Sequence, residues 1–178
     1  HWRILYQLVP EAALSPNRHF VFKDSVQQGE VTSVSVAIEN VTELPFDSML
    51  VKYEMIDKNK NRSTYKTKRY APIPVYDTIH ATIDIESGLF AGQNIFVIEA
   101  NPDNDQSEQF HPNNIGFLNY HVQPDKQNPL IDVTFDGVHI LDKDIVSSKP
   151  FIQIILKDEN KYLALDDTSL VKVYMRFQ

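Results

Sequence analysis

The feature that most constrains the fold of this chain is an alternation of apolar and polar residues that recurs in short blocks. In residues 31–40, the side chains of Val34, Val36 and Ile38 fall on one face of an extended segment. The blocks are bounded by Pro, Gly, Asn or Asp, which favour turns. A period of two indicates strands with one buried face, and turn residues between the strands indicate antiparallel connections. The pattern therefore predicts an all-β protein.

Seven such blocks lie within residues 18–122, and we expect each to form a strand. Their number and spacing are typical of an immunoglobulin-like antiparallel β-sandwich. One block, residues 62–70, is rich in lysine and other polar residues, as expected of an exposed edge strand. The expected strands are residues 19–24, 30–40, 48–57, 62–70, 77–86, 94–100 and 115–122.

We expect further segments on both sides of this sandwich. Residues 1–17 contain Pro10 and Pro16 and are predicted to form an extended lead-in. Residues 123–129 are predicted to form a linker, because polar and proline residues cluster there without an apolar period. The remaining residues, 130–178, are too few for a convincing independent core. We expect them to be the start of a second β-sandwich domain, truncated at its C-terminus in a fragment of a longer polypeptide. The strands expected in this part are residues 130–140, 151–160 and 170–177.

Composition excludes several classes of function. The formal net charge is −7 and the pI is about 5.3, so we expect neither a nucleic-acid partner nor an anionic membrane surface as partner. The chain contains no cysteine, which excludes a thiol nucleophile, a disulfide and a cysteine-based zinc site. No apolar run approaches the roughly 20 residues that a membrane-spanning helix needs, so we expect no membrane insertion.

The segment with the most candidate ligand and catalytic side chains is residues 101–114, which we call the polar loop. Asp103, Asp105 and Glu108 offer oxygen ligands at close spacing, which is one reason to consider a calcium site. The loop nevertheless lacks the glycine and the regular order of a calcium-binding loop. We therefore prefer a structural interpretation, in which Glu108 accepts backbone N–H groups and Asn113 and Asn114 adopt positive φ. The residues assigned to this structural loop are Asn101, Pro102, Asp103, Glu108, Asn113 and Asn114.

Other acidic segments are weaker cation candidates. Asp57, Asn59 and Asn61 are spaced two apart as in a calcium loop, but lysines lie between them and the distal ligand is missing, so a hairpin turn is preferred. The acidic turns after residue 130 could converge at one end of a sandwich, although solvated turns are the simpler interpretation. No cofactor is expected. These acidic residues are Asp136, Asp142, Asp144, Asp158, Glu159, Asp166 and Asp167.

The sequence contains no pattern of residues that predicts catalysis. It has no G-x-S-x-G elbow, P-loop or G-x-G-x-x-G segment, and its histidines are scattered, without an H-E-x-x-H helix. We therefore expect no enzyme activity in this chain. Carbohydrate binding is an alternative, because Tyr65, Tyr70 and Tyr76 could form an exposed aromatic surface. The scattered histidines are His19, His80, His111, His121 and His139.

Residues 20–122 resemble the CARDB-type domain, a cell-adhesion-related immunoglobulin-like module. The resemblance rests on a Gly-Glu turn before a long strand that ends in Asn, and on a later strand followed by an "NPDN" turn, a Glu and an Asn pair. It implies a sandwich that contributes to adhesion or to the spacing of domains. The positions that carry it are Gly29, Glu30, Asn40, Gly92, Asn101, Pro102, Asp103, Glu108, Asn113 and Asn114.

Residues 130–178, together with the first 17 residues, resemble segments of large Bacteroidetes surface proteins. Those proteins are similar to gingipain-type cysteine peptidases of the type IX secretion system, and a peptidase domain would lie outside this fragment. The resemblance implies an extracellular, non-catalytic module after the peptidase region. Its expected partners are neighbouring domains of the same polypeptide, other surface proteins or glycans, and a carbohydrate- or calcium-binding module is the alternative.

Overall fold

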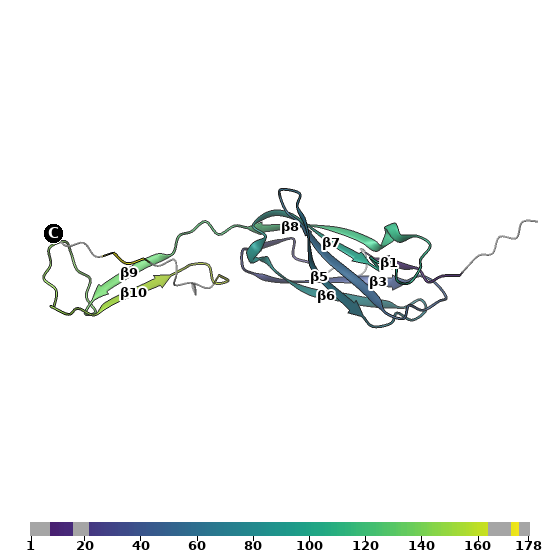
Figure 1. The fold of residues 1–178 in the computed structure, drawn as a ribbon, viewed down its shortest axis with the longest axis horizontal. Coiled ribbons are helices and arrows are strands. Elements are labelled where there is room, and N and C mark those ends of the chain that lie inside the picture. Colours follow the sequence, from purple (N-terminus) through teal and green to yellow (C-terminus); the bar gives the residue numbers. More distant parts are fainter. Residues whose placement is uncertain (1–7, 16–21, 164–171, 175–178) are drawn as a thin grey trace, which may run out of the picture. The chain divides into compact units, whose positions relative to one another are not determined.

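The computed structural model describes residues 8–15, 22–163 and 172–174, and it divides the chain into two compact units, His1–Pro124 and Asp125–Gln178. In the described part of the first unit, eight strands and two short 3-10 helices follow one another (Figure 1). None of the described helices is long and apolar enough to cross a membrane. The elements are β1 (Ala12–Leu14), β2 (Ser25–Gln27), β3 (Val31–Asn40), β4 (Met49–Ile56), β5 (Arg62–Tyr70), β6 (Thr78–Glu86), η1 (Ser87–Leu89), β7 (Gly92–Ala100), η2 (His111–Asn114) and β8 (Ile115–Gln123).

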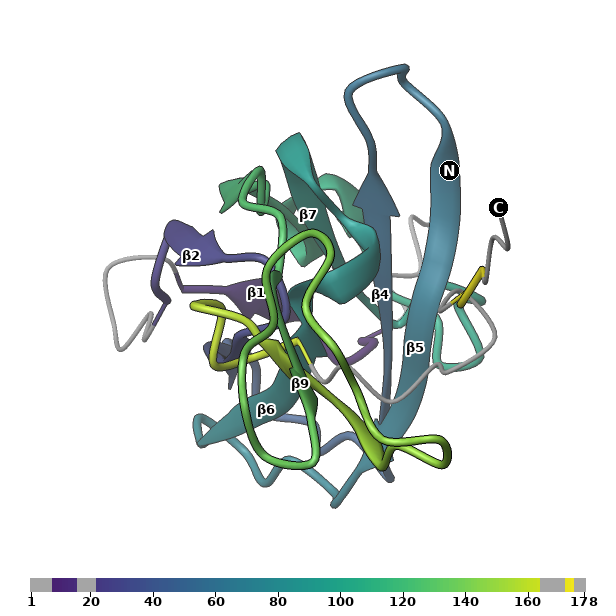
Figure 2. The ribbon, with the colours of Figure 1, turned by 90° about the vertical axis from the view of Figure 1, so that its left-hand side faces the viewer.

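The strands form the two sheets of a β-sandwich, which confirms the predicted fold class. One sheet has the order β1-β3-β6 and the other has the order β2-β8-β7-β4-β5. All pairs are antiparallel except β2 and β8, which run parallel from Ser25 against His121 to Gln27 against Gln123. Figure 2 shows β4 and β5 joined by a hairpin turn at one end of the sandwich.

The core lies between the two sheets and follows the predicted alternation. Val34, Val36 and Ile38 of β3 are fully buried, and they belong to the same cluster as Tyr53 of β4 and Phe96 of β7. Burial of each large apolar side chain contributes roughly 1.5–3 kcal/mol. Tyr53 and Phe96 also stack with ring centroids 5.9 Å apart, which adds a side-chain contact between the neighbouring strands β4 and β7 of the larger sheet.

The N-terminal part differs from the prediction. The expected lead-in, residues 1–17, contains β1, which pairs with the end of β3, and Ala12 is fully buried. The strand expected at residues 19–24 is wrong where it can be seen, since residues 22–24 are not in a strand and β2 begins only at Ser25. The rest of that expected strand, residues 19–21, lies outside the described residues.

The edge strand predicted from its lysines is β5, which is confirmed at the end of the larger sheet. Its pairing with β4 shifts register where Tyr53 opposes Lys66 and Glu54 opposes Thr64, so that Tyr65 is the extra residue of a β-bulge. A bulge bends and twists an edge strand, which discourages pairing with a further strand.

The described residues of the second unit contain one antiparallel pair, β9 (Leu130–Phe135) and β10 (Ile152–Lys157). All six side chains on one face of this pair are apolar, and four of them are at least 37% exposed. The third expected strand, residues 170–177, lies outside the described residues except for 172–174, which are not in a strand. The described residues of this unit thus form a hairpin with an open apolar face, made by Ile131, Val133, Phe135, Ile152, Ile154 and Leu156.

Candidate functional site

The polar loop joins β7 to β8 and turns at two asparagines with positive φ. These are Asn101 (φ 51) and Asn104 (φ 48), and the N–H of Asn104 donates to the carbonyl of Asn101 at 3.0 Å. The expectation of positive φ at Asn113 and Asn114 is wrong, because both lie in η2. The reason is the preceding Pro112, whose fixed negative φ suits the start of a helical turn.

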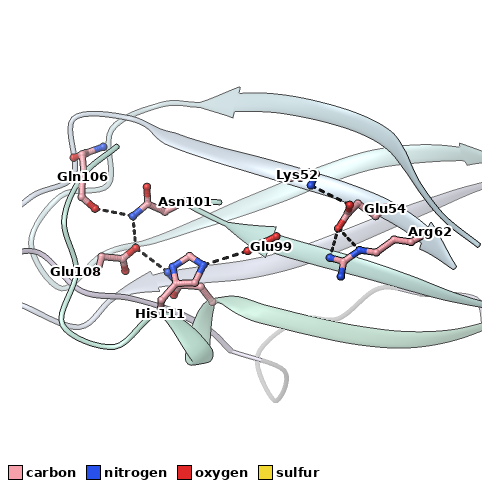
Figure 3. Close-up of polar contacts among 9 residues, drawn as sticks. Lys52, Glu54, Arg62, Glu99, Asn101, Gln106, Glu108 and His111 are labelled. Carbon is pink, nitrogen blue, oxygen red and sulfur yellow. Dashed lines mark hydrogen bonds and ion pairs between the residues drawn. The ribbon is translucent and has the colours of Figure 1, made fainter. Parts of the chain in front are cut away.

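Glu108 bonds within the polar loop, where Figure 3 shows its contact with the Asn101 amide, and it also bonds to β1. Its Oε2 accepts a hydrogen bond from the backbone N–H of Ala12 at 2.8 Å. Its Oε1 accepts bonds from the side-chain amides of Asn114, at 2.8 Å, and Asn101. The Asn101 amide also donates to the carbonyl of Gln106 at 2.7 Å. Glu108 therefore accepts one backbone N–H, from β1, and two side-chain amides, whereas the structural interpretation assigned it backbone N–H groups of the polar loop itself.

Glu11 makes the reciprocal contact from the β1 side. Its Oε2 accepts bonds from the backbone N–H groups of Gln109 and Phe110, at 2.9 and 3.1 Å, and its Oε1 accepts one from the Asn113 amide at 2.9 Å. We call Glu11 and Glu108 together the carboxylate clasp. Sequence reasoning missed Glu11 because its partners lie about a hundred residues away in the chain, and nothing local marks it.

The structure does not bring the three calcium candidates together. Asp105 accepts a hydrogen bond from Arg69 at 2.7 Å, whereas Glu108 is bonded to Ala12 and the asparagine amides. Asp103 is exposed. Within the described part of the chain, no three His, Cys, Asp or Glu side chains are arranged to hold a metal ion.

In the other acidic segments, the side chains of Asp57, Asp136 and Asp144 accept hydrogen bonds from backbone N–H groups of turns and loops. Asp57 Oδ1 accepts the backbone N–H groups of Asn59 and Asn61, both at 2.8 Å, in the turn between β4 and β5. Hydrogen bonds from the Asn61 side chain and backbone lower the pKa of Asp57. In the second unit, Asp136 accepts the N–H of Phe151 and Asp144 accepts that of Leu141, at 2.8 and 2.7 Å. Asp166 and Asp167 lie outside the described residues.

The described histidines do not form a cluster. His111 Nε2 lies 3.2 Å from Glu99 Oε1, and His139 Nδ1 lies 3.5 Å from Asp132 Oδ1 in the second unit. His80 is exposed on β6, and His121 lies on β8, where its backbone N–H donates to the backbone carbonyl of Asp24. His19 lies outside the described residues.

A buried charge on the outer face of the larger sheet was also missed. Glu54 is 5% exposed and is paired with Lys52 at 3.0 Å and with Arg62 (Figure 3). Burial alone would raise the pKa of Glu54, but the hydrogen bonds and charges of Arg62 and Lys52 outweigh burial and lower that pKa. The sequence signal was present, because Lys52 precedes Glu54 by two residues on the same strand and Arg62 begins the neighbouring strand β5, but strand alternation alone placed Glu54 in solvent.

The three tyrosines considered for carbohydrate binding do not form one exposed surface. The Tyr65 hydroxyl accepts the backbone N–H of Glu86 at 3.0 Å and donates to the carbonyl of Asp84 at 3.1 Å. The Tyr70 hydroxyl donates to the carbonyl of Thr82 at 3.0 Å. Both rings pack against the core, whereas Tyr76 is 62% exposed.

Comparison with known proteins identifies the fold. No protein-family model matches the sequence, and no curated protein matches it. One similar structure is the crystal structure of the CARDB domain of a Pyrococcus furiosus protein in complex with di-metal ions. Its sequence identity to this chain is 13% and its TM-score is 0.56, and the match covers 68% of this chain and 100% of that domain. A solution structure of that domain has a TM-score of 0.55 at 14% identity, covering 66% of this chain and 98% of the other.

A third structure has a similar fold and comes from another organism. It is a domain of a provisionally named cell surface protein of Methanosarcina acetivorans, 14% identical with a TM-score of 0.50, covering 65% of this chain and 93% of the other. At these identities the likeness shows fold and nothing more. The chain thus contains an immunoglobulin-like β-sandwich with the fold of CARDB domains.

Proposed function

We propose that the first unit is a non-catalytic structural or adhesive module that spaces or docks neighbouring domains of a large surface protein. The observation that carries this proposal is the carboxylate clasp. In the polar loop, Glu108 accepts hydrogen bonds from β1 and from two asparagines of the loop. Glu11, next to β1, accepts hydrogen bonds from the loop. A loop fixed in this way suits a rigid connector. The CARDB fold, shared with a domain of a protein named for the cell surface, supports the same function.

We further propose that the module lies outside the cell. The resemblance to post-peptidase segments of type IX secretion proteins in Bacteroidetes supports this location, with a gingipain-like peptidase domain elsewhere in the parent polypeptide. The test is protease treatment of intact cells of the source organism, followed by detection with an antibody against residues 1–124. Loss of the signal, with a cytoplasmic protein left intact, is expected. A signal that disappears only after lysis would contradict an exposed location.

The second unit fits the start of another sandwich in the same polypeptide. Its hairpin has one apolar face and one mainly polar face, the pattern of a sheet that covers a core. A two-stranded sheet is marginal without such cover. The amides of β9 and β10 should gain protection from hydrogen exchange when the chain is extended with its natural downstream sequence, and unchanged protection would contradict this assignment.

Calcium binding is the second candidate, because the Pyrococcus furiosus CARDB domain was crystallised with metal ions. In this chain Asp105 accepts a bond from Arg69 and Glu108 accepts one from Ala12, whereas Asp103 is exposed. Carbohydrate binding by the tyrosines is not favoured, because the hydroxyls of Tyr65 and Tyr70 bind β6.

A further inference from the structure

The hairpin formed by β4 and β5 carries most of the positive charge of the first unit. Seven of the ten lysines and arginines in residues 1–124 lie between residues 52 and 69, together with two carboxylates, which gives this segment a formal charge of +5. The rest of residues 1–124 has three such cations and thirteen carboxylates, a formal charge of −10. Surface charges of both signs are usually mixed, and a separate field of one sign steers or binds a charged partner. The seven cations are Lys52, Lys58, Lys60, Arg62, Lys66, Lys68 and Arg69.

Ion pairs within the chain neutralise only part of this positive charge. A single carboxylate, Glu54, is shared by Lys52 and Arg62, and Arg69 is paired with Asp105. Three further lysines are exposed, and no carboxylate of a described residue lies within ion-pair distance of their amino groups. An anionic partner can therefore pair with these three without breaking an ion pair of the fold. They are Lys58, Lys60 and Lys66.

Lys58 and Lys60 lie on a turn that is held by its own hydrogen bonds. Asp57 Oδ1 accepts the backbone N–H groups of Asn59 and Asn61, both at 2.8 Å, and the N–H of Lys60 donates to the carbonyl of Asp57 at 2.9 Å. Figure 2 shows this turn projecting at one end of the sandwich. The two lysines are thus presented on a short, ordered arm, so that little backbone freedom is lost when a partner binds.

We propose that the β4–β5 hairpin binds an anionic polysaccharide, whose acidic groups pair with Lys58 and Lys60 at the turn and with Lys66 further along β5. A single polysaccharide chain is narrow, so it can follow this edge strand and stay clear of the carboxylates on the rest of the unit. A DNA duplex or a membrane surface is broad, so it would approach those carboxylates and be repelled. The choice of a polysaccharide rests on the proposed location at the cell surface, whereas the separation of charge does not.

Binding of the whole chain to immobilised alginate, a carboxylated polysaccharide, tests this proposal, with neutral dextran as the reference surface. We expect binding to alginate at low salt, little binding to dextran, and a loss of affinity as the salt concentration rises. The double variant Lys58→Ser, Lys60→Asn should bind alginate about tenfold more weakly, because it removes two cations from the arm. Its melting temperature should not fall, since φ at position 60 is 66 and asparagine adopts positive φ more readily than lysine.

The matched control is the double variant Lys143→Asn, Lys149→Ser in the second unit. It removes the same two charges, and Lys143 also has positive φ (74), but it lies between Asp142 and Asp144. We expect its binding to alginate to equal that of the wild type. An equal loss in both double variants, equal binding to dextran, or no binding to alginate at low salt would overturn the proposal.

Tighter binding to duplex DNA or to phosphatidylglycerol vesicles than to alginate would overturn the polysaccharide as the partner. The measurement uses the purified chain. Its failure therefore leaves the surface location standing, and protease treatment of intact cells tests that location separately.

Discussion

At the scale of single residues, Glu108 shows how a carboxylate can stabilise a fold without a cation. It accepts one backbone N–H and two side-chain amides, and these donors come from β1, the start of the polar loop and η2. Asn101 and Asn114 are almost fully buried and cannot bond to bulk water, so their amide groups need an acceptor within the protein. The three segments are therefore tied together through one side chain.

We expect Glu108→Ala to lower the free energy of unfolding by about 1–3 kcal/mol, because it leaves buried donors without an acceptor. Urea denaturation of the wild-type and variant chains measures the change. Asp103→Ala is the matched control, since it removes an exposed carboxylate from the same loop. If both substitutions had the same small effect, Glu108 would not have the structural role described above.

Glu54 makes stability depend on pH in a predictable direction. Its pKa is lower in the folded chain than in the unfolded one, because the hydrogen bonds and charges of Arg62 and Lys52 outweigh burial. The ionised Glu54 side chain therefore makes its full contribution to the free energy of unfolding at pH values above the ordinary pKa of a glutamate. The contribution is lost as the pH falls through the lowered folded-state pKa.

We expect Glu54→Gln to be less stable than the wild type at neutral pH, and we expect the difference to shrink on acidification through the carboxyl range. Urea denaturation at a series of pH values tests this. Asp57 titrates in the same direction in both proteins, so its effect cancels in the difference. Glu86→Gln, at an exposed position on β6, is the control. A difference that stays constant with pH would show that the charge of Glu54 does not contribute.

At the scale of elements, β5 and β6 are edge strands of different sheets, and side chains of β5 connect the two edges by hydrogen bonds. The Tyr65 and Tyr70 hydroxyls bind backbone groups on the outer edge of β6, and Lys68 Nζ donates to the carbonyl of Thr82 at 3.2 Å. Tyr65 is the residue of the bulge in β5. The bulge thus coincides with the side chain that links the two sheets.

We expect Tyr65→Phe to destabilise the sandwich by about 0.5–1.5 kcal/mol, because it removes two hydrogen bonds and leaves the ring in place. Hydrogen exchange of the Glu86 amide, whose N–H donates to that hydroxyl, should accelerate as well. Tyr76→Phe is the control, since Tyr76 is 62% exposed. Unchanged exchange at Glu86 would contradict the closing role of Tyr65.

The elements also show how far sequence reasoning reaches. The long strands β3, β4, β6, β7 and β8 were predicted because alternation of period two is reliable over many residues. β1 and β2 have three residues each, too few to show a period, and β1 is defined by bonds to Glu108 and β3 rather than by its own residues. In the polar loop, the importance of Glu108 could be predicted, but Glu11 could not, because non-local contacts leave no local pattern.

At the scale of the whole molecule, the hydrophobic core belongs to the first unit. Every buried residue of the main cluster lies between Ala12 and Val122. In the second unit, the apolar side chains of the hairpin are partly exposed instead. The two units therefore differ in how much of their stability they can supply themselves.

We expect a fragment of residues 1–124 to unfold cooperatively, within a few degrees of the melting temperature of the full chain. The physical reason is that the fragment retains the whole described core and the carboxylate clasp. Circular dichroism during heating of both chains measures this. A fragment without a cooperative transition would show that residues 125–178 are needed for the sandwich to fold.

Calcium dependence of the melting temperature is the most direct test of a structural polar loop. Asp105 is bonded to Arg69, and Glu108 is bonded to Ala12 and to buried amides. These two carboxylates are therefore not available to bind one ion together. We expect the melting temperature in millimolar calcium to equal that in a chelator. A ligand that binds only the folded state must raise stability, so a calcium-dependent rise of several degrees would contradict the structural assignment of this loop.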